Sequence, residues 1–476
     1  MGTRPHKELG GKSIIIRLEI SGDQMNFGLV ANMVSNLGGD IIAIDTIHIG
    51  GESSIRDMTV NVVDASSIQS ITDAIEKIPG IRVVNTSDRT FLLHLGGKIE
   101  MTPKVTIQNR DDLSRVYTPD VARVCQAIAE YPNKAFSLTI KRNTVAVVTD
   151  GSAVLGLGNI GPKAAMPVME GKAMLFKQFA GVDAFPICLD TTDTEEIIRT
   201  VKLIAPAFGG INLEDISSPR CFEIEARLRA ELDIPVFHDD QHGTAVVAYA
   251  GLINALKLAG KSISDATVVV CGIGAAGVAI TDILLSAGVK EVIGVDKEGI
   301  LVGGETYSNP VKTKYATYTN PNRRTGALRD ALQGADVFIG VSGGKLLTRE
   351  DVLMMAPNPI VFAMANPEPE ILPAEIDDIA AVVATGRSDY PNQINNVLCF
   401  PSMFRAALDC RASEITEGMK LAASEAIASV IPDDKLGKYY IIPSVFDQMV
   451  AERIRDRVIR AAITGGVARR IPKEYR

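Results

Sequence analysis

Two pairs of adjacent carboxylates follow apolar stretches of the chain, Glu214-Asp215 and Asp239-Asp240. The second pair comes just after residues 234–237, which read as a short buried strand, and α/β sheets keep their ligand sites at the C-terminal ends of strands. Three carboxylates from neighbouring strands would repel one another unless a cation joined them. Because all-oxygen ligation favours Mg²⁺ or Mn²⁺ over Zn²⁺, the sequence predicts a divalent metal site at this edge.

Two other interpretations compete with a carboxylate metal site. Adjacent acids usually belong to a solvated surface, which needs no metal. His238 and His242 are spaced four residues apart and would suit zinc, but no cysteine or third histidine stands near them in the sequence. We therefore prefer a hard cation held by carboxylates.

A lysine and a tyrosine offer acid and base chemistry. Lys172 lies in the otherwise apolar segment 167–176. Most lysines in such segments extend to water, but one kept from water has its pKa lowered towards neutrality and becomes a usable general base. Tyr117 precedes a helix that Thr118 or Asp120 can cap. A lone tyrosine is by default a packed side chain, so its catalytic interpretation depends on its neighbours.

Two segments carry the G-x-G-x-x-G pattern of dinucleotide sites, and the first is residues 156–161 after a strand at 144–149. The acid that ends the next strand, Asp190, comes 29 residues after Gly161, where about 20 are expected. Pro162 also follows the last glycine directly. We interpret this loop as a substrate site, where backbone amides at a helix start approach a small anion.

The second segment, residues 272–277, has every part of the dinucleotide fingerprint. A strand at 266–270 precedes it, a helix to Ala287 and a strand at 291–295 follow, and Asp296 lies 19 residues after the last glycine. The glycines form the turn, admit the pyrophosphate and let helix and strand pack, while the aspartate accepts from the ribose hydroxyls. The predicted NAD or NADP site comprises Gly272, Gly274, Ala275, Ala276, Gly277 and Asp296.

The elements around these residues predict an α/β protein with three domains. Residues 1–95 carry a βαββαβ pattern, with strands expected at 13–20, 42–49 and 56–63 and a last pair at 81–84 and 91–95. A linker from Gly96 to Asp112 leads to a substrate and metal domain at 96–244. A doubly wound parallel sheet follows at 245–476, with strand ends at 341, 365 and 385 near the nicotinamide and helices that return to pack from Met403 onward.

The first domain resembles the ACT domain, a small ferredoxin-like regulatory module that pairs sheets edge to edge. The resemblance rests on the element order and on Asn26-Phe27-Gly28 at the start of the first helix, and it covers about eighty residues. It implies that a small-molecule effector binds near residues 21–26. Dimerisation alone is the alternative role.

Composition limits the partners. The net charge is −8 and the pI is about 5.4, so no basic surplus exists to bind nucleic acid or anionic membranes. No apolar run reaches the roughly 20 residues of a spanning helix, and no signal peptide is evident. Six cysteines without a C-x-x-C pair fit a reducing, cytoplasmic compartment.

Eight motifs resemble, in order and spacing, the compact malic enzymes of bacteria and archaea over about residues 95 to 465. They are VYTPDVA, TDGSAVLGLGNIGP, PVMEGKAMLF, NLEDI, FHDDQHGTA, CGIGAAG, ANPEPEI and NQINNVLCFP. The resemblance implies a homodimer or larger homo-oligomer that converts (S)-malate to pyruvate and CO₂ with a divalent metal and reduction of NAD(P), NAD being slightly favoured. The alternatives are a metal-dependent 2-hydroxyacid dehydrogenase that does not decarboxylate, and a ligand sensor on an inactive dehydrogenase scaffold.

The resemblance also implies roles for individual residues. Lys172 is the base that takes the C2 hydroxyl proton, Asp239 is paired with it, and Tyr117 is the acid that protonates C3 of enolpyruvate. In two places the chain departs from relatives, with Asp120 where glycine is usual and Ala153 where animal-type enzymes have arginine. The remaining implied residues are Glu214, Asp215 and Asp240 for the metal, Asn366 for the cofactor, and Asn395, Asn396 and Ser152 for the substrate.

Overall fold

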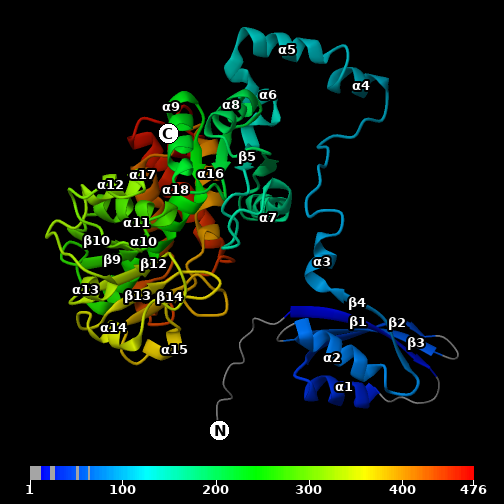
Figure 1. The fold of residues 1–476 in the computed structure, drawn as a ribbon. Coiled ribbons are helices and arrows are strands. Elements are labelled where there is room, and N and C mark those ends of the chain that lie inside the picture. Colours follow the sequence, from blue (N-terminus) through cyan, green and yellow to red (C-terminus); the bar gives the residue numbers. More distant parts are fainter. Residues whose placement is uncertain (1–11, 22–26, 50–52, 63–64) are drawn as a thin grey trace. The chain divides into compact units, whose positions relative to one another are not determined.

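A computed structural model describes residues 12–21, 27–49, 53–62 and 65–476 (Figure 1). The chain divides into two compact units, Met1–Glu100 and Met101–Arg476, which are described separately. Among the described residues, no helix is both long enough and apolar enough to cross a bilayer.

The first unit is an antiparallel sheet in the strand order β2-β3-β1-β4, with helices α1 and α2 packed on one face (Figure 1). The alternation of apolar and charged residues along β1 determines which face of the sheet the helices cover. Ile14, Ile16 and Leu18 are buried, whereas Arg17 on the other face forms an ion pair with Asp57 at 2.7 Å. The elements are β1 (Lys12–Ser21), α1 (Phe27–Asn36), β2 (Asp40–Ile49), β3 (Ser53–Val62), α2 (Ala65–Ile75) and β4 (Ile81–Asp88).

The strand predicted at 91–95 is wrong, because these residues belong to helix α3 (Arg89–His94) and its C-terminal cap. Asp88 caps this helix by accepting a hydrogen bond from the Thr90 backbone N–H at 2.8 Å. A short apolar run gave the appearance of a strand, but β4 already forms the edge of the sheet. Except for Ser21, the predicted effector segment at 21–26 lies outside the described residues.

The second unit contains two parallel sheets, and the first has the order β6-β5-β7-β8. The chain leaves β5 for β6 on one side and then crosses to β7 on the other, which creates a switch point where ligands bind in such sheets. The elements are β5 (Thr144–Thr149), α7 (Pro162–Ala180), β6 (Asp183–Cys188), α8 (Thr194–Ile204), β7 (Gly210–Leu213), α9 (Arg220–Glu231) and β8 (Val236–His238).

The second sheet has the order β11-β10-β9-β12-β13-β14 and is parallel except for the short β11. It repeats the switch of direction, here between β9 and β12, so the predicted doubly wound sheet is confirmed. The elements are β9 (Thr267–Cys271), α11 (Ala275–Ser286), β10 (Glu291–Asp296), β11 (Gly299–Ile300), α12 (Pro310–Ala316), α13 (Leu328–Leu332), β12 (Val337–Gly340), α14 (Arg349–Leu353), β13 (Ile360–Ala363), α15 (Pro373–Ile376) and β14 (Val382–Thr385).

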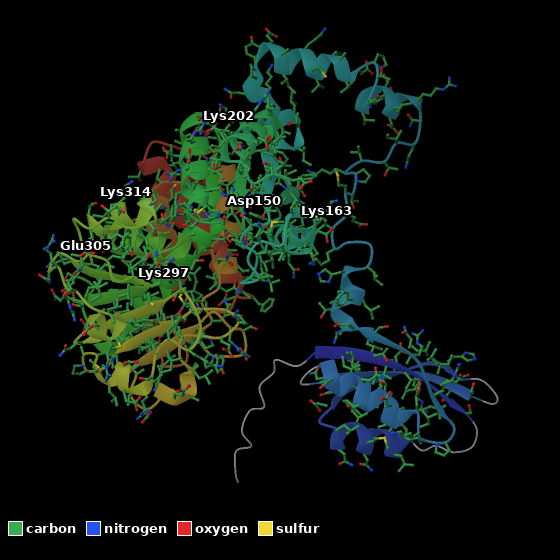
Figure 2. The ribbon with its side chains drawn as sticks, viewed as in Figure 1. Asp150, Lys163, Lys202, Lys297, Glu305 and Lys314 are labelled. Atoms are coloured by element: carbon green, nitrogen blue, oxygen red, sulfur yellow. The ribbon has the colours of Figure 1, made fainter. Side chains whose placement is uncertain are left out.

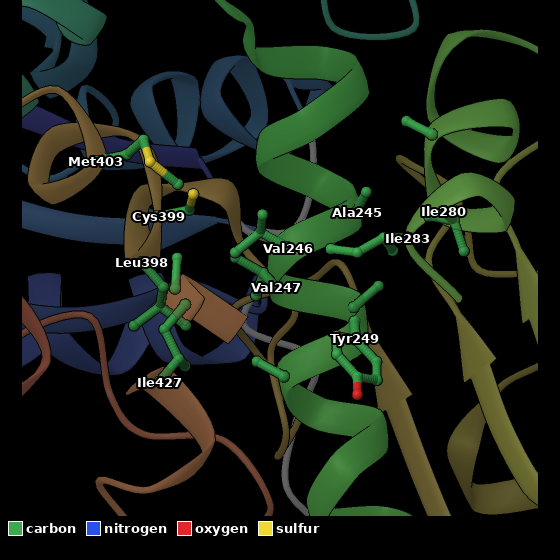
Figure 3. Packing of buried hydrophobic residues seen from close by; sticks show 14 of the residues in the cluster. Ala245, Val246, Val247, Tyr249, Ile280, Ile283, Leu398, Cys399, Met403 and Ile427 are labelled. Atoms are coloured by element: carbon green, nitrogen blue, oxygen red, sulfur yellow. The ribbon is translucent and has the colours of Figure 1, made fainter. Parts of the chain in front are cut away.

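Helix α10 (Asp239–Ala259) connects the two sheets and is buried along most of its length. Figure 3 shows Val246, Val247 and Tyr249 of this helix among residues of α11 and of the C-terminal segment. The helix begins at Asp239, six residues before the predicted start at Ala245. The returning helices α16 (Phe400–Asp409), α17 (Glu417–Ala428) and α18 (Gln448–Thr464) complete this core.

Residues 101–143 form a helical arm in which no residue is buried. Part of the predicted linker is in fact helix α4 (Arg110–Val116), which Asn109 caps by accepting from the Asp112 N–H at 2.9 Å. Helix α5 (Val121–Glu130) and the short α6 (Ala135–Leu138) follow α4 along the chain. The arm still carries many large apolar side chains on its surface: Met101, Val105, Ile107, Leu113, Val116, Tyr131, Leu138 and Ile140.

Candidate active site

Three carboxylates meet where β7 and β8 end. These strands are neighbours with Leu213 opposite His238, so the residues that come directly after them, Glu214-Asp215 and Asp239-Asp240, emerge side by side. One oxygen each from Glu214, Asp215 and Asp240 lies within 4.8 Å of the others. The register of two parallel strands therefore brings together acids that are distant in the sequence.

The backbone at Asp215 is held in the left-handed region, with φ of +53°. Its N–H donates to Asp240 Oδ2 at 2.8 Å, while its own Oδ2 is buried and has no hydrogen-bond partner among the described residues. Burial raises the pKa of Asp215 to about 7, and repulsion from Asp240 adds to this effect. A buried oxygen of this kind beside two further carboxylates fits a hard divalent cation such as Mg²⁺ or Mn²⁺.

Lys172 of α7 is buried next to these acids. Its Nζ donates to Asp239 Oδ2, lies 2.9 Å from Glu214 Oε1 and stands 3.9 Å from the centre of the Phe400 ring. The expectation that burial lowers its pKa is wrong for this structure. Burial does act in that direction, but the charges of Asp239 and Glu214 outweigh it and raise the Lys172 pKa above its usual range.

Asp239 occupies the first turn of α10, and burial raises its pKa to about 6. Gly243, one turn later, leaves room for this carboxylate, because a Cβ there would lie 1.9 Å from Asp239 Oδ1. Asn396 donates to Asp239 Oδ2. Asn395 instead caps a short helix at 396–398 by accepting from the Val397 N–H at 3.0 Å. Of the two predicted asparagines, only Asn396 is hydrogen-bonded to the lysine and aspartate pair.

The loop after β5 turns back through four glycines with positive φ before α7 begins at Pro162. A Cβ on Gly156 would lie 3.2 Å from the Asn366 carbonyl oxygen, so this loop reaches the end of β13 in the second sheet. The Ser152 hydroxyl accepts from the Ser217 N–H at 2.9 Å and from Arg220 at 3.0 Å. Ser152 is therefore tied into the loop structure.

The second glycine segment has the geometry of a nucleotide turn. Gly272 has φ of +100°, and a Cβ on Gly277 would lie 2.0 Å from the Gly272 carbonyl oxygen. No described atom would lie within 4 Å of a Cβ on Gly274, which caps α11, so that helix start is open. These features fit a dinucleotide whose pyrophosphate lies against the first turn of α11.

Asp296 ends β10 beside this turn. Its carboxylate accepts from the Ile273 N–H at 2.9 Å and the Lys297 N–H at 2.7 Å, and Lys312 lies 2.8 Å away. Lys312 is also 2.9 Å from Glu298, so two acids surround it. By contrast, the side chains of Lys297 and Lys314, both labelled in Figure 2, are exposed.

Tyr117 does not join the Lys172 cluster within the chain. It forms the C-terminal cap of α4 in the arm, and 73% of it is exposed. Sequence reasoning also missed Glu225, a buried acid of α9 that accepts hydrogen bonds from the chain around Asp240. No spacing links Glu225 to that motif, and only its place inside a helix with buried apolar neighbours was a signal.

These features define an NAD(P)-dependent oxidoreductase: a nucleotide turn, a buried lysine among carboxylates, and two switch points joined by one helix. Two family profiles support this class of protein. The malic enzyme N-terminal domain matches residues 96–229, and the malic enzyme NAD binding domain matches residues 241–463. The chain therefore belongs to the malic enzyme family and oxidatively decarboxylates malate with reduction of NAD(P).

Individual relatives agree with this assignment. The chain is 63% identical to an NAD-dependent malic enzyme of Geobacillus stearothermophilus over 96% of each chain. It is 56% identical to a bifunctional malic/malolactic enzyme of Bacillus subtilis, over 78% of this chain and 92% of the relative. The crystal structure of an NAD-dependent malic enzyme from Thermotoga maritima superposes with a TM-score of 0.76 at 51% identity, covering 78% of this chain and 99% of that one.

Proposed function

We propose that Lys172, Asp239, Glu214, Asp215 and Asp240 form the reaction centre for malate. The observation that carries this assignment is the position of Lys172, whose ammonium group is buried between Asp239 and Glu214, while Glu214 also belongs to the carboxylate cluster. Glu214 thus links the proposed base, Lys172, to the proposed metal site. In this assignment residues 96–244 supply the substrate and metal domain, and residues 245–476 supply the NAD(P)-binding domain.

Each residue has a defined task in the reaction. Glu214, Asp215 and Asp240 hold the divalent cation. Lys172 takes the C2 hydroxyl proton, and Asp239 receives or returns a proton through its contact with Lys172. When bound, NAD(P) accepts the hydride from C2 and the cation draws electrons from the C2 oxygen as the C3–C4 bond breaks to release CO₂. Tyr117 then donates a proton to C3, which yields pyruvate.

The raised pKa of Lys172 is compatible with this role. A base must be unprotonated when substrate arrives, and in the chain alone two carboxylates favour its charged form. A cation bound by Glu214 would weaken one of these two attractions. Lys172 is then held by Asp239, whose pKa of about 6 makes it a suitable partner for the exchanged proton.

We propose that a substrate carboxylate binds the loop at 150–161. Gly161 caps the 19-residue helix α7 with φ of +78°, so backbone N–H groups at this helix start are free of a side-chain cap. Asn396 donates a hydrogen bond to Asp239. The Ser152 hydroxyl is already hydrogen-bonded within the loop. We therefore assign malate binding to the backbone amides of the loop and to Asn396.

We also propose that the enzyme is a homodimer whose subunits exchange their arms. The arm at 101–143 exposes its apolar side chains and buries none, which is costly unless another molecule covers them. Tyr117 lies in this arm and does not reach Lys172 of its own chain. A second copy that receives the arm would bury the apolar residues and gain Tyr117 as its acid.

The first unit is proposed to bind a small-molecule effector in the manner of an ACT domain. Its antiparallel sheet with helices on one face leaves β2 as an edge strand with Ile42, Ile44 and Ile47 largely exposed. Edge strands of this kind pair with another chain. Both family profiles begin at or after residue 96, which supports a role for this unit apart from malate chemistry.

The assignment of Lys172 is tested by Lys172→Ala. We expect malate oxidation with Mn²⁺ to fall by at least about 1,000-fold, because Lys172 is the base in contact with Asp239, while NAD binding measured by calorimetry is retained. Lys177→Ala serves as the control, since Lys177 is an exposed lysine of the same helix. Turnover of the Lys172 variant within tenfold of the control would refute the assignment.

A further inference from the structure

The motif at 238–242 contains three residues that the reaction does not use. His238, Gln241 and His242 flank the two aspartates at the start of α10, and all three contact Glu225 of α9. Glu225 accepts from the His238 backbone N–H at 3.2 Å, from Gln241 Nε2 at 3.3 Å and from His242 at 2.9 Å. One buried carboxylate thus organises the segment that carries Asp239 and Asp240.

Glu225 is ionised despite its burial. Burial by itself would raise its pKa, but the contact with His242 outweighs burial and brings the pKa to about 2. On the far side of His242, Lys420 lies 3.1 Å from Nδ1 and is itself buried. The negative charge of Glu225 is therefore compensated through His242 and is a fixed acceptor.

This acceptor determines which way the Gln241 amide points. A carboxylate can only accept, so the amide must present its NH₂ group to Glu225. The same nitrogen lies 2.8 Å from His238 Nδ1. Its second hydrogen therefore points at Nδ1, and Nδ1 must be the bare, accepting nitrogen of the ring.

The ring of His238 then carries its proton on Nε2. That nitrogen is fully buried and lies 3.2 Å from Asp240 Oδ2. This contact is an electrostatic one, because His238 Nε2 has no aligned hydrogen-bond partner among the described residues. Asp240 Oδ2 also accepts from the Asp215 N–H, and the other Asp240 oxygen is left for the cation. The same tautomer explains why His238 is not itself a ligand, because its lone pair faces Gln241.

We propose that Glu225 is a positioning residue for the metal site, which acts through Gln241 and His238 to hold the Asp240 carboxylate in its binding orientation. The inference rests on the metal site proposed above. Its consequence is that a change at Glu225, which touches neither substrate nor cation, lowers the affinity of the protein for the cation.

The test is a titration of the full-length protein with Mn²⁺ alone, followed by electron paramagnetic resonance. Glu225→Gln keeps the shape but can turn an NH₂ group towards Gln241, and we expect its Mn²⁺ dissociation constant to rise by about 10- to 100-fold. Gln241→Met cuts the link while leaving the contact between Glu225 and His242, and we expect a similar rise. The matched control is Glu370→Gln, which alters a fully buried acid outside the cluster that accepts from the backbone N–H groups of Ala365 and Ser342.

A second readout separates positioning from loss of structure. Ring ¹⁵N resonances of His238, assigned by their loss in His238→Gln, should show a protonated Nε2 in the wild type. We expect this proton to shift to Nδ1, or to exchange between the nitrogens, in Glu225→Gln. Wild-type Mn²⁺ affinity in both Glu225→Gln and Gln241→Met, or an equal loss in Glu370→Gln, would overturn the proposal. If Asp240→Asn binds Mn²⁺ as tightly as the wild type, the metal site itself is wrong and the positioning role falls with it.

Discussion

At the scale of single residues, the site depends on how a few buried charges are shared. Lys172 is surrounded by Asp239 and Glu214, and each of these acids has a second task, at Asn396 and in the carboxylate cluster. Each of these three charged groups therefore interacts with more than one partner. A small displacement of Asp239 should therefore disturb proton transfer while the protein remains folded.

Gly243→Ala makes such a displacement. The new Cβ would lie 1.9 Å from Asp239 Oδ1, so the carboxylate has to move, and a shift of about 1 Å in a reacting group can cost about 100-fold in rate. We expect kcat with malate and Mn²⁺ to fall by about that factor, with the midpoint of thermal unfolding little changed.

The control for this substitution is Gly251→Ala, in the same helix. Its Cβ would meet the tip of the Ile394 side chain, at 3.0 Å, and this tip can move aside. We expect activity within a few-fold of the wild type. Equal activities of the two variants would show that the position of Asp239 is not critical.

At the scale of elements, two strand-turn-helix units carry similar glycine patterns and differ in the aspartate that comes after the second strand. After β9 the chain reaches Asp296 at the end of β10, whose carboxylate lies against the nucleotide turn through the Ile273 N–H. After β5 the corresponding Asp190 is exposed and lies beyond the end of β6. The geometry around Asp296 supports the second unit as the cofactor site.

Substitution of these two aspartates compares the units directly. Asp296→Ala removes a charged acceptor for the ribose hydroxyls, which is worth about 1.5–3 kcal/mol. We expect the KM for NAD to rise by roughly 10- to 100-fold, and the KM for NADP to rise less because the variant also loses a charge that repels the 2′-phosphate. A larger effect of Asp190→Ala would move the cofactor to the first glycine loop.

At the scale of the whole molecule, the arm and the first unit are the parts that a single catalytic centre does not explain. The arm buries no residue of its own, and the first unit forms a separate compact body. We assign the arm to subunit exchange and the first unit to regulation, and each assignment has its own test.

Exchange of arms predicts complementation between inactive subunits. In a heterodimer of Lys172→Ala and Tyr117→Phe chains, one site has the intact lysine and receives the intact tyrosine from its partner. After dissociation and random mixing of equal amounts, about half of the dimers are mixed and each has one working site, so we expect about a quarter of wild-type activity.

A mixture of Lys172→Ala with Asp240→Asn is the control, because both changes affect residues that one chain supplies together. This mixture should stay inactive. If the first mixture also stays inactive while size measurements show mixed dimers, Tyr117 acts within its own chain or not at all.

Removal of the first unit predicts loss of regulation with retention of chemistry. A chain that begins at Lys98 contains nearly all of both matched family regions and should oxidise malate. Coupling between sites is typically worth about 1–3 kcal/mol, so an effector should change the malate affinity of the full chain by about 5- to 150-fold and leave the shortened chain unaffected. Identical responses of the two chains to a panel of amino acids and central metabolites would assign the first unit to assembly alone.

The sequence by itself determined the elements that depend on local pattern. Period-two alternation located β1, β2 and β3, and the glycine spacing at 272–277 with Asp296 predicted the strand-turn-helix-strand unit of β9, α11 and β10, because each signal lies within one supersecondary motif. The prediction at 91–95 is wrong because a short apolar run there resembles a strand, whereas the cap at Asp88 starts a helix. The start of α4 was also missed, because its first residues belong to a polar stretch that resembles a linker.

Only the tertiary structure decided properties that depend on distant neighbours. The pKa of Lys172 is raised because chain folding brings Asp239 and Glu214 to it, and no feature of segment 167–176 contains that information. The same holds for Glu225, whose role depends on the packing of α9 against the start of α10. The exposure of Tyr117 is likewise a property of the folded arm, since burial depends on the surroundings of a residue and not on its type.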